Sequence, residues 1–119
     1  MILTSLNGQL NQTISPHDRG LLFGESIYEV IPIYHQRPFY LDMHLSRLSS
    51  SFKALFSIDL DQPKILQWIT SFIQHMSTAE FSAIYIQVTT GSQQKHRDHL
   101  HHNMRLPNVI ISEYPCEPM

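Results

Sequence analysis

Two neighbouring stretches with helical periodicity constrain the fold of this chain more than any other feature. In residues 41–56 the apolar side chains recur at steps of three and four, and Asp42 in the first turn suits the helix dipole. In about residues 63–76 a second stripe follows Asp61, a suitable N-cap. Each helix therefore has one apolar face. The two stripes consist of Leu41, Leu45, Leu48, Phe52, Leu55 and Phe56, and of Ile65, Leu66, Ile69, Phe72, Ile73 and Met76.

Segments with strand character precede the two helices. Residues 2–6 are typical of a short strand, and the Asn7-Gly8 pair that follows is a strong hairpin signal because both positions tolerate positive φ. Residues 27–34 alternate in character and are rich in β-branched and aromatic side chains, which favours a strand. Pro32 cannot donate a hydrogen bond to a neighbouring strand, so we expect a bulge or a sheet edge there.

Two further strands follow the helices. Residues 82–89 have period two, with Ile84, Ile86 and Val88 on one side, and residues 108–114 form a last strand. The order of strands, two helices and strands is an α+β pattern and not a repeating βαβ one. We therefore predict a small two-layer domain in which an antiparallel sheet packs against two helices.

Turn-forming residues mark the connections between these elements. Residues 15–20 predict a turn-rich loop, and residues 35–38 predict a turn after which Phe39 and Tyr40 begin a short return. Residues 90–106 form a long polar loop of the kind that is usually functional or disordered.

Composition excludes some classes of function. The chain has 119 residues, which fits one domain, and its net charge of -2 gives no electrostatic reason to expect nucleic acid or an anionic membrane as a partner. The single cysteine, Cys116, cannot form an internal disulfide, which favours a reducing compartment. Neither a signal peptide nor a membrane span is evident, so we expect a cytoplasmic location.

Three groups of residues could carry chemistry. In the first, residues 18–30, two glycines flank an apolar turn that leads into a strand beginning with Tyr28 and Glu29. The glycine spacing does not match a dinucleotide-binding loop, and a tight loop entering a strand is the simple structural interpretation. The second is Arg47, which lies beside the apolar stripe of its helix. Arg47 could extend to solvent, or it could hold a phosphate with its planar fork.

The third group lies in the polar loop, at residues 95–102. A transition metal could bind to His96, Asp98, His99 and His101, but the spacing matches no strong zinc pattern. Arg97 and His99 could instead grip a carboxylate, and a solvated polar loop is the third interpretation.

Several ordered motifs of this chain resemble the fold-type IV enzymes that use pyridoxal 5'-phosphate (PLP). They are the opening LNG hairpin, DRGLLFGESIYEVIPIY, the helix entry PFYLDMHLSRL and the strand AIYIQVTTG. This family contains D-amino-acid aminotransferases, branched-chain aminotransferases and aminodeoxychorismate lyases. The IYEVIPIY form is most similar to the D-amino-acid branch.

The resemblance implies roles for individual residues. Arg47 falls where the family places an arginine on the PLP phosphate, and Tyr28 where the D-amino-acid branch places a tyrosine that contacts the substrate carboxylate. Glu29 would support the site from beneath, and Tyr85 matches a tyrosine on the strand that lines the pocket.

In the D-amino-acid branch an arginine and a histidine, separated by one residue, reach the substrate carboxylate across a dimer. Arg97 and His99 have this spacing if the loop carries about two extra residues; without a gap, Lys95 and Arg97 take the two places. We prefer Arg97 and His99. The family's TRG motif has an arginine where this chain has Thr90.

The family's Schiff-base lysine belongs to a second domain. The lysines of this chain are Lys53, Lys64 and Lys95, and none lies in a segment that matches the family's lysine motif. We therefore expect residues 1–114 to be the N-terminal domain and residues 115–119 to begin a linker, so that this chain contains no catalytic residue and is inactive without its second domain.

The resemblance implies a transaminase that is complete only with the second domain. It would use PLP to move an amino group from a D-amino acid such as D-alanine to a 2-oxo acid, and it would work as a homodimer. An aminodeoxychorismate lyase or a branched-chain aminotransferase on the same scaffold is the alternative. A non-catalytic binding or dimerisation module is a hypothesis of another class.

Overall fold

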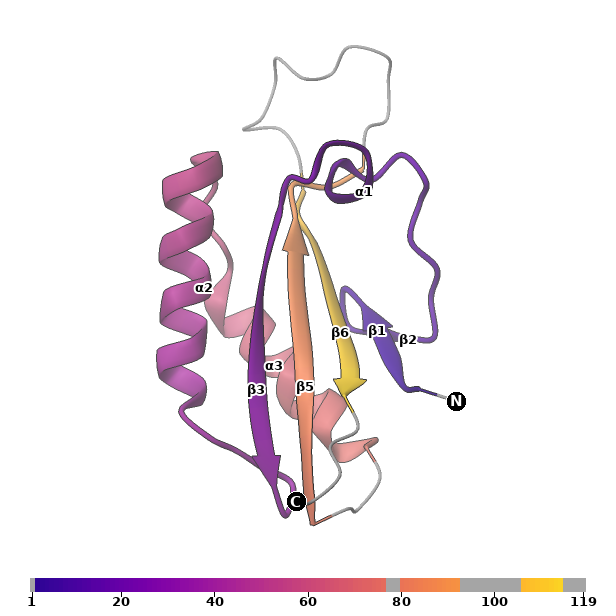
Figure 1. The fold of residues 1–119 in the computed structure, drawn as a ribbon, viewed down its shortest axis with the longest axis vertical. Helices are drawn as coiled ribbons and strands as arrows, with labels where there is room; N and C mark the ends of the chain where they lie inside the picture. The colour runs from indigo at the N-terminus through magenta and orange to yellow at the C-terminus, as the bar shows by residue number, and fades with distance from the viewer. Residues whose placement is uncertain (1, 77–79, 93–105, 115–119) are drawn as a thin grey trace.

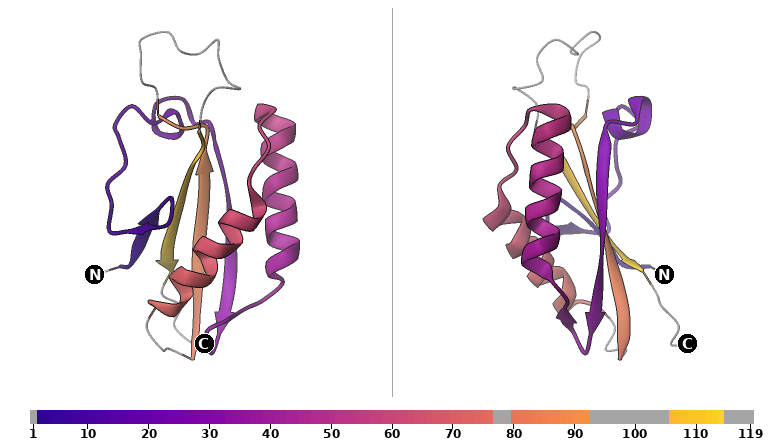
Figure 2. Two further views of the ribbon diagram at one scale, coloured as in Figure 1. Left: turned by 180° about the vertical axis from the view of Figure 1, so that it is seen from behind. Right: turned by 60° about the vertical axis from the view of Figure 1, so that its left-hand side comes forward.

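The computed structural model describes residues 2–76, 80–92 and 106–114. In this part of the chain, strands form a six-stranded sheet of order β2-β1-β6-β5-β3-β4, and every neighbouring pair is antiparallel. The helices α2 and α3 cover one face of the sheet (Figures 1 and 2). The predicted two-layer α+β fold is therefore confirmed.

The chain begins with the expected hairpin of β1 (Thr4–Leu6) and β2 (Gln9–Leu10). Asn7 and Gly8 form its turn with φ values of 51° and 85°. Gly8 also lies so close to a helix that a Cβ atom there would come within 2.4 Å of the Trp68 indole nitrogen. The turn therefore needs glycine both for its backbone conformation and for its packing.

The centre of the sheet consists of β3 (Ser26–Tyr34), β5 (Phe81–Thr89) and β6 (Asn108–Tyr114). β3 and β5 pair one-to-one along their whole length, so Pro32 causes no bulge. The oxygen of Pro32 accepts a hydrogen bond from the amide of Phe39, so its main-chain polar groups point away from β5. The edge alternative for Pro32 is therefore right, and the bulge is excluded.

The strand β4 (Arg37–Pro38) pairs with only the last two residues of β3 in the described part of the chain. The turn before it is shorter than predicted, because His35 and Gln36 both adopt positive φ, at 48° and 63°, and reverse the chain within two residues. The rest of β3 is therefore an edge of the sheet.

Helix α2 spans Leu41–Phe56 as predicted, and α3 spans Gln62–Gln74, two residues shorter at its C-terminal end. The carboxylate of Asp61 accepts a hydrogen bond of 3.1 Å from the amide of Lys64, which confirms Asp61 as N-cap. No helix in the described ranges combines the length and the apolar character that a membrane span requires.

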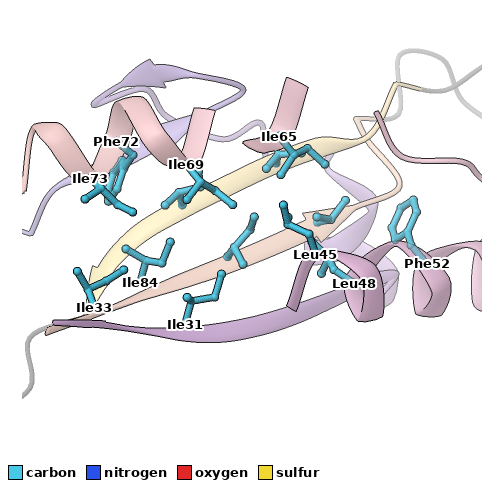
Figure 3. Packing of buried hydrophobic residues seen from close by; sticks show 14 of the residues in the cluster. Ile31, Ile33, Leu45, Leu48, Phe52, Ile65, Ile69, Phe72, Ile73 and Ile84 are labelled. Atoms are coloured by element: carbon cyan, nitrogen blue, oxygen red, sulfur yellow. The ribbon is translucent and has the colours of Figure 1, made fainter. Parts of the chain in front are cut away.

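The core lies between the two helices and the sheet (Figure 3). Alternate residues of β3 and β5 point into it, as the period of two predicted. Leu55 departs from the predicted helical stripe: it is exposed in the last turn of α2, where Phe56 packs edge-on against Phe52 at 5.0 Å instead. The labelled core residues are Ile31, Ile33, Leu45, Leu48, Phe52, Ile65, Ile69, Phe72, Ile73 and Ile84.

Residues 19–23 correct the prediction of a loop and an apolar turn, because they form the short helix α1 (Arg19–Phe23). The Asp18 carboxylate accepts a hydrogen bond of 2.7 Å from the amide of Gly20 and so caps the first turn. Gly24 ends the helix with φ 68°, and its amide donates back to a carbonyl of the helix. The two glycines of the motif thus belong to a capped helical turn that leads into β3.

Candidate functional site

Glu29 is a charged residue on the face of β3 that otherwise builds the core. Its neighbours on the same face are Ile27 and Ile31, and α2 packs over this part of the strand. The Glu29 side chain is only 10% exposed. An ionised carboxyl in such a position requires partners, because burial without them is costly.

Arg47 of α2 supplies the first partner. Its Nε lies 2.9 Å from Oε2 of Glu29 and 3.1 Å from Oε1, and its Nη2 lies 2.6 Å from Oε1. This is a bidentate pair in which one edge of the guanidinium meets both carboxylate oxygens. Glu29 thus holds Arg47 from the side of the sheet, and its support of a ligand site from beneath stays a prediction.

His44 supplies the second partner, and sequence reasoning missed it. Its Nδ1 lies 2.7 Å from Oε1 of Glu29, and its side chain is nearly buried. His44 and Arg47 are three residues apart on α2, so they lie on one face of the helix and reach the same carboxylate. That spacing was the signal available in the sequence.

These contacts decide the charge of Glu29. Burial of the carboxyl works to raise its pKa, but hydrogen bonds and charges from Arg47 and His44 outweigh it and hold the pKa below the ordinary value. The hydrogen bond from Arg47 to Glu29 in turn raises the pKa of the guanidinium. The Glu29–Arg47 pair is therefore ionised at neutral pH.

The pair is also directional. The Arg47 side chain is 59% exposed, whereas that of Glu29 is 10% exposed. Among the described residues, the hydrogen bonds of Arg47 use Nε and Nη2, and the Nη1 side of the guanidinium is left toward the surface. A guanidinium that is fixed by a buried carboxylate on one edge and exposed to solvent on the other is suited to binding an anion through two of its oxygens, as in a phosphate.

Tyr28 and Tyr85 lie on the other face of the sheet. Their rings stack with centroids 4.8 Å apart and an interplanar angle of 13°. Burial and the neighbouring Tyr28 raise the pKa of Tyr85, so its hydroxyl stays protonated at neutral pH. The structure thus brings the two predicted tyrosines together, and it separates them from Arg47 by the thickness of the sheet.

The Glu29–Arg47 pair and the Tyr28–Tyr85 stack lie on opposite faces of the sheet, and both are reached from the open edge of β3. Tyr28 and Glu29 are consecutive, so their side chains leave opposite faces of the strand. In the described part of the chain no strand pairs with this end of β3 on its outer side. A ligand beside this edge could contact both faces.

The predicted carboxylate grip, Arg97 and His99, and the alternative residue Lys95 lie outside the described residues. The proposed metal ligands His96, Asp98, His99 and His101 do so as well. In the described ranges there is no cluster of three or more histidine, cysteine or acidic side chains that could hold a metal.

Thr90, the departure from the family's TRG motif, has a structural contact. Its side chain is fully buried and its hydroxyl donates a hydrogen bond of 2.9 Å to Glu25. Glu25 also forms an ion pair with Arg19 at 2.7 Å. Sequence reasoning did not single out this second Arg–Glu pair.

Next to the Arg19–Glu25 pair lies a buried hydrogen-bond network around Asp18. One of its carboxylate oxygens accepts a hydrogen bond from the hydroxyl of Thr89 at 2.8 Å and another from the side-chain amide of Asn108 at 2.6 Å. The network joins the start of α1 to the ends of β5 and β6, from which the polar loop departs and to which it returns.

The two lysines in the described ranges have surface contacts. Lys53 pairs with Asp59 at 3.0 Å, and the Lys64 ammonium lies 5.6 Å from the centre of the Trp68 ring. Neither contact includes a residue of the Glu29–Arg47 pair. Lys95 lies outside the described residues.

Comparison with known families identifies the class. A family model described as amino-transferase class IV matches residues 26–114, which include both tyrosines and the whole of α2. The chain therefore belongs to the class IV aminotransferase family, as the motifs predicted.

Curated relatives are more specific. The chain is 30% identical over 117 residues to the D-alanine aminotransferase of Bacillus licheniformis, covering 93% of this chain and 40% of the relative. It is 30% identical over 108 residues to that of Listeria monocytogenes serotype 1/2a (strain 10403S), covering 88% of this chain and 33% of the relative. The chain thus spans well under half the length of these relatives.

Solved structures show the same fold. The 4-amino-4-deoxychorismate lyase from Pseudomonas aeruginosa matches with a TM-score of 0.79 at 24% identity, covering 95% of this chain and 40% of that one. A hypothetical aminotransferase from Mycobacterium tuberculosis, in a PLP-bound form, matches with a TM-score of 0.81 at 17% identity, covering 98% and 41%.

Proposed function

We propose that this chain is the N-terminal part of a PLP-dependent transaminase and that it anchors the cofactor's phosphate. The observation that carries the proposal is the Arg47 guanidinium, which is held from behind by Glu29 and exposed in front. Two oxygens of a phosphate monoester can accept hydrogen bonds from the planar guanidinium of such an arginine. The position of Arg47 in the resemblance to the PLP family points to the same role.

PLP fits the chemistry of these residues. The guanidinium offers fixed cationic donors to a dianion, and the carboxylate behind it is already neutralised by two donors, so it does not repel the phosphate strongly. Bound PLP would supply an electron sink for the substrate carbon that loses or gains the amino group. Arg47 would hold and orient the cofactor without taking part in proton transfer.

Tyr28 and Tyr85 would form the substrate side of the site. The Tyr28 side chain is 58% exposed, and its ring is kept in position by the stack on Tyr85. Its phenol could therefore donate a hydrogen bond to a substrate carboxylate without a large loss of side-chain entropy on binding. Arg97 and His99 would grip that carboxylate from the polar loop.

A second domain would complete the site. The sheet face opposite α2 and α3 exposes large apolar side chains, and exposed apolar patches of this kind mark surfaces that bind other protein. We propose that residues 1–114 form the N-terminal domain, that residues 115–119 begin the linker, and that the second domain supplies the Schiff-base lysine. The complete enzyme would be a homodimer. The exposed residues are Tyr28, Val30, Tyr34, Phe81 and Tyr114.

The substrate we propose is a D-amino acid such as D-alanine, with a 2-oxo acid as acceptor. The similarity to two D-alanine aminotransferases supports this choice. The alternatives on the same scaffold are an aminodeoxychorismate lyase and a branched-chain aminotransferase. They are retained because Thr90 replaces the arginine of the family's TRG motif.

The test is a transamination assay of the complete encoded protein, loaded with PLP, on D-alanine and L-alanine in parallel. We expect turnover of D-alanine and at least tenfold less of L-alanine, about 1.4 kcal/mol of discrimination. Turnover of the L-form without the D-form would overturn the stereochemical assignment. Absence of any transamination, with PLP bound, would favour the lyase or a non-catalytic module.

A further inference from the structure

Arg47 is exposed, yet it must be rigid to act as a preorganised anion site. A long exposed arginine has many rotamers, and a site that must first order its own side chain binds more weakly. Within the described residues, the hydrogen bonds that hold the Arg47 guanidinium are those to Glu29. The orientation of the Glu29 carboxylate therefore sets the orientation of the guanidinium.

His44 is the group that fixes the carboxylate. Its Nδ1 lies 2.7 Å from Oε1, the same oxygen that accepts from Nη2 of Arg47 at 2.6 Å. An ionised carboxylate can only accept, so Nδ1 carries the proton and donates. The ring is nearly buried, and if it swung away the buried Glu29 carboxylate would lose one of its two partners among the described residues.

We propose that His44 is a positioning residue for anion binding: through Glu29 it locks the Arg47 guanidinium in the plane that receives a phosphate. The proposal rests on the proposed function for the identity of the anion. The locking of Arg47 by His44 and Glu29 is independent of the proposed function, because it is a property of these three side chains.

Two consequences distinguish this role from simple packing. The Arg47 Nε–H should give a single, slowly exchanging NMR signal, because it is held by Glu29. His44 should be in the tautomer with the proton on Nδ1 when neutral, a state that nitrogen chemical shifts report. A histidine that only fills space would affect stability and neither of these signals.

The experiment uses the full 119-residue chain and four variants. His44→Phe keeps the buried ring and removes the donor, and His44→Asn returns an amide N–H near the position of Nδ1. Arg47→Ala removes the cation. His75→Phe is the control, because the Nδ1 of His75 is also hydrogen-bonded, but its partner is the Ser71 carbonyl of α3, the helix that His75 caps at its C-terminal end.

The probes are pyridoxine 5'-phosphate and pyridoxine, which lack the aldehyde and cannot react with lysines. We expect the phosphate to strengthen binding in the wild-type chain and in the control, and this gain to vanish in Arg47→Ala. His44→Phe should weaken binding of the phosphorylated probe about tenfold, and His44→Asn should restore it to within about threefold. Binding of pyridoxine should change in none of them.

The two hypotheses fail in different ways. If the wild-type chain binds both probes equally, the phosphate role of Arg47 is wrong, and the Nε–H signal still decides the role of His44. If that signal and the phosphate gain persist in His44→Phe, the positioning role is overturned. Should His44→Phe not fold, loss of the Nε–H signal in a folded His44→Ala chain supports the proposal, and its persistence there overturns it.

Discussion

Among its described residues, the domain contains two bidentate Arg–Glu pairs that differ in what they leave exposed. In the first, Arg19 meets Glu25 through Nε at 2.7 Å and Nη2 at 2.8 Å, and its side chain is 6% exposed. In the second, Arg47 meets Glu29 in a similar way but is 59% exposed. The chemistry of the two pairs is the same, and their surroundings are opposite.

This difference in the exposure of the arginine indicates which pair could bind a ligand and which only stabilises the fold. The guanidinium of Arg19 also lies 4.5 Å from the centre of the Phe23 ring, so protein surrounds the cation as well as the acid. This pair joins α1 to the start of β3. In the Glu29–Arg47 pair only the acid is buried, so the cation is available to a ligand. One pair therefore serves the fold and the other is suited to a site.

The largest effect that we expect from this comparison comes from Arg19→Ala. The substitution removes a side chain that is only 6% exposed and lies over the Phe23 ring, and it takes the Arg19 charge away from the Glu25 carboxylate, which together cost about 3 kcal/mol of unfolding free energy. Urea denaturation of the variant and the wild-type chain measures it. A loss no greater than that of Arg47→Ala would show that the two pairs are equivalent.

Arg47→Ala should have a smaller effect on stability and a larger one on binding. Most of the Arg47 side chain is already in solvent, so its removal leaves little unfilled space in the interior, and the Glu29 carboxylate keeps its hydrogen bond to His44. Isothermal titration with pyridoxine 5'-phosphate should then detect no phosphate-dependent gain, while the thermal midpoint stays above that of Arg19→Ala. Equal affinity in the variant and the wild-type chain would remove Arg47 from the site.

The pH dependence of stability should reveal the Glu29 carboxylate. Its folded pKa lies below the ordinary value of 4.5, so its contribution is present above that pH and is lost as the pH falls through the folded pKa. The contribution of the carboxylate to the difference in unfolding free energy between the wild-type chain and Glu29→Gln should therefore be present above about pH 5 and shrink as the pH falls below it. A difference that does not shrink in acid would contradict this assignment.

The smallest effect should come from Lys53→Ala. Lys53 and Asp59 form an ion pair at 3.0 Å, but both side chains are more than half exposed. Solvent screens such a pair, so the unfolding free energy should change by less than about 0.5 kcal/mol. The same urea titration checks it, and a change as large as that of Arg19→Ala would mean that burial does not separate these pairs.

Much of the fold followed from local pattern in the sequence. The period of two in β5 and the stripe in α2 predicted which side chains enter the core, because strand and helix geometry repeat regularly along the chain. Residues 19–23 were predicted less well: their short helix depends on a cap from Asp18, whose other oxygen is bonded to Thr89 and Asn108 far along the chain.

The candidate site divides in the same way. The sequence by itself determined that Tyr28 and Glu29 leave opposite faces of a strand, and its motifs pointed to Arg47. Only the tertiary structure decided that His44 shares the Glu29 carboxylate, and that Arg47 and not Arg19 is the exposed cation. The reason is physical: periodicity is a property of neighbouring residues, whereas burial and pairing depend on which distant element packs against them.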